Sequence, residues 1–142
     1  MVGLGEAFNL YNDGKTHELE INKTKEIRDN FWSELRQLIP KVELNGPNFI
    51  DRHAGNLNVF FPGVEAADLI MALQPNICAS SGAACSSSSI EPSYVLNSIH
   101  DDKFKAKFSL RLSFCSTQES EEIKKATRFI AKKYFELLTI SD

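Results

Sequence analysis

The sequence of 142 residues has the composition of a single globular domain. Hydrophobic residues make up 42% and charged residues 25% of the chain, a balance that suits an apolar core and excludes a disordered protein. The formal net charge of -3 at pH 7 provides no broad basic surface for nucleic acid, and no apolar run approaches the roughly 20 residues of a membrane span. Because the N-terminus also lacks the layout of a secretory signal peptide, we expect a cytoplasmic protein that binds neither nucleic acid nor a membrane.

The first forty residues predict a long helix. Apolar residues recur there every three to four positions, which places them on one stripe. They are Ile27, Phe31, Leu35 and Leu38. Pro40 ends the helix, and Asn12-Asp13-Gly14 is expected to break or kink it upstream. A helix of this length often packs against partners beyond its own domain.

Short strands and helices alternate in the rest of the chain. The predicted strands are 42–44, 57–61, 77–79 and 108–114. The predicted helices are 65–73, 92–99 and a last one through 123–137. Ser116 and Glu119 form a capping box before this last helix. Interleaved helices over a small sheet predict an α/β or α+β fold, built as a two-layer sandwich.

The three cysteines are Cys78, Cys85 and Cys115, an odd number without C-x-x-C spacing. We therefore expect neither a disulfide framework nor a metal site. Apolar neighbours predict that Cys78 and Cys115 are core thiols. Cys85 instead stands in the loop 80–89, which holds six serines, two alanines and one glycine. Free backbone N–H groups in such a loop lower a thiol pKa and favour reactivity; the alternative is an inert cysteine in a flexible connector.

Arg111 is the second candidate functional residue. It lies between Ser109 and Ser113 on the polar face of an otherwise apolar predicted strand. A guanidinium held by a strand suits bidentate recognition of a carboxylate or phosphate. The alternative is an arginine whose stem covers the sheet while its charge reaches water.

Four segments follow one another in an order that is specific to a family. They are Arg52-His53-Ala54-Gly55-Asn56, Ser80-Ser81-Gly82-Ala83-Ala84-Cys85, Glu91-Pro92-Ser93-Tyr94 and Ser109-Leu110-Arg111-Leu112-Ser113. In this order they strongly resemble the C-terminal region of cysteine desulfurases of the NifS and IscS type. Gly3-Leu4-Gly5-Glu6-Ala7 is similar to the start of the long helix that joins the two domains of these enzymes. The resemblance implies an interdomain helix over residues 1–40, and over residues 41–142 the small domain of a fold-type I enzyme, with the cysteine loop at 80–89.

The same resemblance implies a role for each candidate residue. In the family, L-cysteine forms an imine with pyridoxal 5′-phosphate (PLP), and a loop thiolate attacks its sulfur, leaving alanine and an enzyme persulfide. Cys85 aligns with that nucleophile, and Arg111 aligns with the arginine that binds the substrate carboxylate. The implied partners are a second copy or a PLP-domain chain, and a sulfur-acceptor scaffold protein of iron-sulfur cluster assembly or thiolation.

The PLP-binding lysine, the ring-stacking histidine and the aspartate of the family belong to a large domain that precedes these segments. We therefore expect this chain to bind no PLP and to be inactive by itself, as a split-gene product, a gene remnant or a truncated piece. Two alternatives from other functional classes stay open. One is a persulfide carrier that receives sulfur on Cys85, and the other is a non-catalytic module that pairs with a full-length desulfurase.

Overall fold

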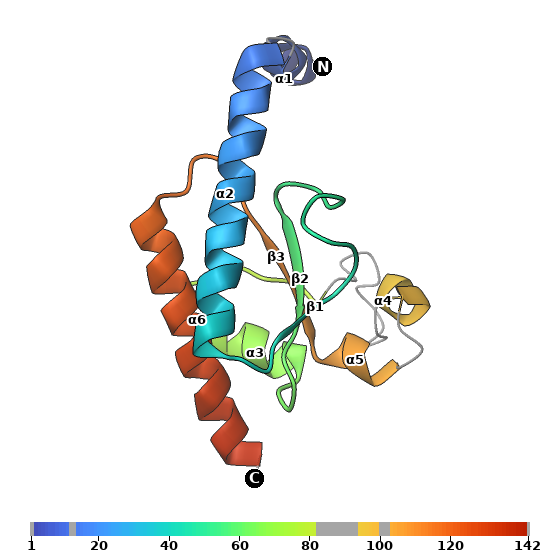
Figure 1. The fold of residues 1–142 in the computed structure, drawn as a ribbon, viewed down its shortest axis with the longest axis vertical. Coiled ribbons are helices and arrows are strands. Elements are labelled where there is room, and N and C mark those ends of the chain that lie inside the picture. The colour runs from blue at the N-terminus through green and yellow to red at the C-terminus, as the bar shows by residue number, and fades with distance from the viewer. Residues whose placement is uncertain (1, 12–13, 82–93, 100–102, 142) are drawn as a thin grey trace.

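A computed structural model gives the arrangement of the chain (Figure 1) and describes residues 2–11, 14–81, 94–99 and 103–141. Cys85 and the predictions made for its loop lie outside the described residues, apart from Ser80 and Ser81. The helices are α1 (Val2–Tyr11), α2 (Gly14–Leu38), α3 (Ala66–Leu73), α4 (Tyr94–Ile99), α5 (Lys103–Lys107) and α6 (Ser120–Ser141). The strands are β1 (Glu43–Leu44), β2 (Asn56–Phe60) and β3 (Ser109–Ser113).

The three strands form one antiparallel sheet in the order β1-β2-β3. Strand β2 is central, and its Asn58 stands directly opposite Arg111 of β3. The prediction of a strand at 77–79 is wrong, because this segment forms no ladder and only Ser80 makes an isolated bridge, to Arg111. A turn at residues 74–76 immediately precedes the segment, and among the described residues the chain first pairs with the edge of β3 at Ser80.

The main core lies between the sheet and the helices α2 and α6, which run along one face of it (Figure 1). Ile27, Phe31 and Leu35 are buried as predicted, but Leu38 is 37% exposed and Ile39 is 1% exposed. The reason is that the Ile39 N–H still donates to the Leu35 carbonyl, at 2.8 Å, so the stripe continues at a spacing of four residues. These elements confirm helices packed on a small sheet, and the antiparallel pairing makes the fold α+β.

Helix α6 starts later than the predicted capping box. Its first residue is Ser120, and the Glu119 N–H donates to Glu122 Oε2 at 3.4 Å. Before it, Gln118 closes a separate turn, since its Oε1 accepts a hydrogen bond from the Cys115 N–H at 3.0 Å. The capping glutamate is therefore Glu122 rather than Glu119. The turn from Cys115 to Gln118 includes Ser116, which was predicted to begin the capping box, so the helix begins only after it.

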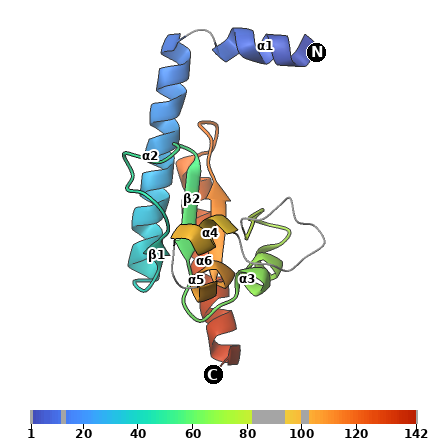
Figure 2. The ribbon, with the colours of Figure 1, turned by 90° about the vertical axis from the view of Figure 1, so that its right-hand side faces the viewer.

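The N-terminal helix has few contacts. Helix α1 ends at Tyr11 and α2 begins at Gly14, with the predicted break between them, and α1 turns away from the axis of α2 (Figure 2). Leu4 and Phe8 of α1 are 77% and 68% exposed. Among the helices that the structure describes, none combines the length and the apolar content that a membrane crossing requires.

Candidate functional site

Arg111 occupies the middle of β3, and backbone segments pair with it on both sides of the strand. Asn58 faces it in β2, and Ser80 pairs with it on the other side. The Arg111 N–H donates to the Ser80 carbonyl at 2.6 Å, and the Ser80 N–H donates to the Arg111 carbonyl at 3.2 Å. The side chain of Arg111 is half-buried. The loop that carries Cys85 in the sequence therefore starts beside Arg111.

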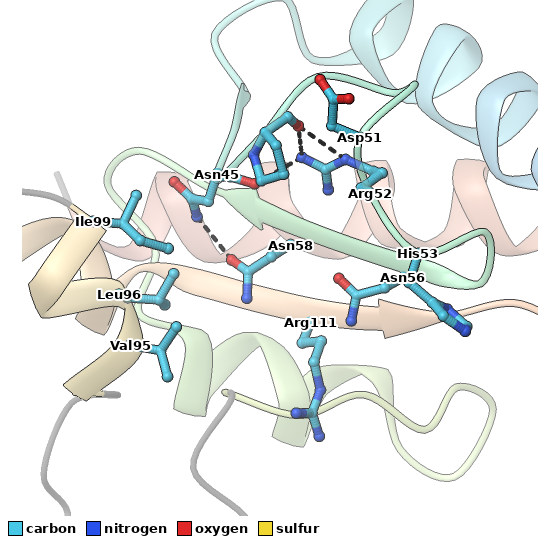
Figure 3. A pocket seen from close by; sticks show the side chains of 12 residues that line it. Asn45, Asp51, Arg52, His53, Asn56, Asn58, Val95, Leu96, Ile99 and Arg111 are labelled. Carbon is cyan, nitrogen blue, oxygen red and sulfur yellow. Dashed lines mark hydrogen bonds between the residues drawn. The ribbon is translucent and has the colours of Figure 1, made fainter.

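A cavity of about 380 Å³ adjoins Arg111. Its walls differ in chemistry, as Figure 3 shows. The sheet contributes a polar wall with Asn56 and Asn58 beside Arg111, whereas α4 contributes apolar side chains. These are Val95, Leu96 and Ile99. Such a cavity suits a small ligand with one charged end.

Two arginines hold the segment 45–55, which forms the rim of this cavity. Arg52 donates from Nη2 to the Asn45 carbonyl at 2.9 Å and from Nε to the Pro47 carbonyl at 3.1 Å. Arg28 donates to the carbonyls of His53 at 3.0 Å and Phe49 at 3.3 Å. Both guanidinium groups lie over the Phe49 ring, 5.1 Å (Arg28) and 5.7 Å (Arg52) from its centroid.

Burial, and secondly the charge of Arg28, lower the pKa of Arg52. An arginine nevertheless keeps its charge in proteins. The Arg52 donors are directed at backbone carbonyls, so Arg52 shapes the rim. Its N–H groups are less available to a ligand in the cavity than those of Arg111.

The segment 53–56 fixes one imidazole and requires a glycine. His53 accepts the Gly55 N–H at its Nδ1, at 3.1 Å, so neutral His53 carries its proton on Nε2. A Cβ added at Gly55 would lie 2.5 Å from the Phe114 carbonyl oxygen. Only glycine at position 55 therefore lets this turn approach the end of β3 so closely.

A buried relay of hydrogen bonds connects β1, β2 and β3. Asn45 is 3% exposed, and its Nδ2 donates to Asn58 Oδ1 and to Ser109 Oγ, both at 2.8 Å. Ser109 Oγ in turn donates to the Lys105 carbonyl at 2.6 Å. Sequence reasoning missed this relay, because no local pattern links Asn45 to Ser109.

The prediction that Cys78 and Cys115 are core thiols is wrong. Both are exposed. Cys78 lies in the segment that fails to form a strand and lines a separate cavity of about 410 Å³, while Cys115 follows the end of β3 with its Sγ 3.1 Å from Thr117 Oγ1. Apolar sequence neighbours did not imply burial because each cysteine stands just outside a regular element.

The comparisons with known proteins agree with one another. The model of the family "Aminotransferase class-V" matches residues 1–126. The chain belongs to this family. The cysteine desulfurase IscS of Ehrlichia chaffeensis is 39% identical over 140 residues, which cover 99% of this chain and 33% of that protein. The IscS of Rickettsia bellii is 37% identical over 142 residues, 99% of this chain and 33% of that protein.

Solved structures support the same family at the level of the fold. A NifS-like protein from Rickettsia africae is 25% identical with a TM-score of 0.64, over 82% of this chain and 29% of that one. A second NifS-like protein has a TM-score of 0.64 at 20% identity, over 79% of this chain and 27% of that one. This class-V aminotransferase chain thus spans about a third of the length of the curated relatives that it matches.

The described residues do not form a PLP-binding site. Among them, no lysine lines the cavity beside Arg111, whereas the family binds PLP through a lysine amine. No group of three or more His, Cys, Asp or Glu side chains in the described parts of the chain could hold a metal ion. The described wall of the cavity, with the guanidinium of Arg111, is instead suited to a small anion.

Proposed function

We propose that this chain is the C-terminal part of a cysteine desulfurase, with residues 1–40 as the interdomain helix and residues 41–142 as the small domain. The reaction converts L-cysteine to L-alanine and moves the sulfur to Cys85 as a persulfide. The observation that carries the proposal is the bridge between Ser80 and Arg111. It joins the base of the cysteine-bearing loop to the arginine of the cavity.

Covalent reach supports this assignment. Cys85 follows Ser80 by five positions in the sequence, so even a fully extended chain keeps it within about 18 Å of the bridge. Glycine and alanine at positions 82–84 put no bulky side chain between the two. A thiol on such a segment can reach a substrate that is bound beside Arg111 and then carry sulfur away from it.

Arg111 has the role of binding and orienting the substrate carboxylate. Within the described parts of the chain its guanidinium has no hydrogen-bond or ion-pair partner, and the two oxygens of a carboxylate would satisfy it bidentately. The Cys85 thiolate attacks the substrate sulfur, the carbon–sulfur bond breaks, and the carbon takes up a proton to give alanine. PLP would supply the electron sink for that cleavage, and residues outside those described would hold it.

The partners follow from this role. A second copy or a PLP-domain chain completes the active site, and a scaffold protein of iron-sulfur cluster assembly or thiolation accepts the sulfur in the cytoplasm. Without such a PLP-binding part, the 142 residues should not release alanine from L-cysteine.

The test combines this chain with a separately produced PLP-binding domain of a cysteine desulfurase. L-cysteine is added, alanine is quantified, and each cysteine is examined by mass spectrometry for one added sulfur. We expect alanine and a persulfide on Cys85, both lost in Cys85→Ser and both kept in the matched control Cys115→Ser. Alanine release that survives Cys85→Ser contradicts the proposal. Sulfur uptake from a separate persulfide donor by the chain alone favours the carrier.

Alkylation of the chain alone gives a second test. Because Cys78 and Cys115 are exposed, exposure does not favour Cys85 over them, and a faster reaction of Cys85 requires a stabilised thiolate. We expect brief iodoacetamide treatment at neutral pH to label Cys85 first. Slower labelling of Cys85 than of the other two contradicts both the desulfurase and the carrier.

A further inference from the structure

We propose that Asn58 is a second carboxylate-binding residue of this site, whose side-chain N–H donates to the same substrate carboxylate as Arg111. The inference rests on the proposed function, because the carboxylate is that of the amino-acid substrate. It goes beyond that function by assigning a second ligand-binding group and a buried residue, Asn45, that orients it.

The orientation of the Asn58 amide follows from the relay. The Lys105 carbonyl can only accept, so the Ser109 hydroxyl donates to it and must accept from Asn45. The Nδ2 group of Asn45 therefore faces both Ser109 and Asn58, and its two hydrogens are used on Ser109 Oγ and Asn58 Oδ1. Asn58 consequently presents its oxygen to Asn45 and directs its Nδ2 away, as Figure 3 shows. No protein atom within the described residues accepts from this Nδ2.

The position of Asn58 brings it to Arg111. The two residues are direct cross-strand partners, which places their Cβ atoms about 4.5–5.5 Å apart on the same face of the sheet. Both line the same cavity. In Figure 3 the Asn58 nitrogen and the Arg111 side chain lie on the same side of the strands.

The charges around the pair favour an anion. Arg111 and the Asn58 Nδ2 group offer only donors, and the wall opposite them from α4 is apolar. Asp51 is the one carboxylate that lines the described cavity, and Figure 3 places it beyond Arg52, away from Asn58 and Arg111. A ligand with two acceptor oxygens, such as an α-carboxylate, fits one guanidinium and one amide better than a neutral group does.

The experiment titrates the ¹⁵N-labelled chain with L-alanine, the carboxylate-bearing product, and follows the side-chain N–H signals of Asn58 and Arg111. L-alaninol, which lacks the carboxylate, is the ligand control. Asn58→Asp keeps an acceptor for Asn45 but replaces the donor by an anionic oxygen. Asn56→Asp is the matched variant, since Asn56 also lines the cavity and the same charge is introduced there without loss of the donor opposite Arg111.

We expect L-alanine, and not L-alaninol, to shift both signals with one saturation curve. Asn58→Asp should weaken binding at least about tenfold more than Asn56→Asp does. Equal effects of the two variants, or a shift of Arg111 without one of Asn58, overturn this inference and leave the role of Arg111 intact. No saturable shift of either signal, or unchanged affinity in Arg111→Gln, overturns the role of Arg111 as well.

Discussion

The two faces of the small sheet are built by different rules. On the face covered by α2 and α6, Leu57, Val59 and Leu110 are fully buried among apolar side chains. On the other face, Asn58 and Arg111 border a cavity, and the buried Ser109 beside them is satisfied by hydrogen bonds. The first face stabilises the fold by apolar packing. On the second face, hydrogen bonds orient side-chain donors toward the cavity.

The difference shows how a thin domain can combine stability with a polar site. The relay of Asn45, Asn58 and Ser109 satisfies the buried polar atoms of the second face, so that the face costs little stability. Arg111 is excluded from this relay and is available to a ligand. Substitutions on the two faces should therefore separate stability from binding.

The largest effect is expected on the helix-covered face. Leu110 is fully buried, and Leu110→Ala should lower the free energy of unfolding by about 2–5 kcal/mol, because lost apolar burial and a cavity add together. Urea unfolding followed by circular dichroism measures this value. Met71→Ala, at a side chain that is 74% exposed, is the control and should change stability little. A cost below about 1 kcal/mol at Leu110 would contradict the packed face.

The relay should give the next largest effect. Asn45→Ala removes a buried side chain that donates two hydrogen bonds, and we expect a loss of about 1–3 kcal/mol in the free energy of unfolding. Asn48→Ala, at an exposed position of the same segment, is the matched control for the same urea experiment. Equal stability of the two variants would show that the relay is replaced by water.

The contrast between the faces also explains what could be predicted from the sequence. The apolar face follows from periodicity, so Ile27, Phe31 and Leu35 of α2 were placed correctly, whereas Leu38 is exposed and Ile39 is buried in its stead. The polar relay joins Asn45 to Ser109, 64 positions apart, and no local pattern reports such a contact. Arg111 was predicted as a candidate because a charge interrupts an apolar strand, and the structure places it at a cavity. The prediction of a strand at 77–79 was wrong because strand formation depends on a neighbouring edge to pair with, and a short apolar run does not reveal that edge.

Tyr134 tests the packed face through pH. Its hydroxyl donates to the Pro62 carbonyl at 2.8 Å, so Tyr134→Phe should cost about 1 kcal/mol at neutral pH. Burial raises the pKa of Tyr134; the unfolded tyrosine therefore ionises first, near pH 10, and the native state loses stability as pH rises further. The stability difference between the two proteins should shrink between roughly pH 9 and 11. A constant difference over this range would contradict the raised pKa.

The smallest effect on stability is expected at Arg111. Its side chain is half-buried without a partner in the described residues, so Arg111→Gln should change the free energy of unfolding by no more than about 0.5 kcal/mol. Arg28→Gln provides the contrast, because Arg28 is 1% exposed and donates to two backbone carbonyls. Its loss should be clearly larger in the same urea series. A near-neutral Arg111→Gln would mean that the guanidinium is maintained for a ligand rather than for the fold. A cost as large as that of Arg28→Gln would instead make Arg111 a structural residue, and the division between the two faces would no longer hold.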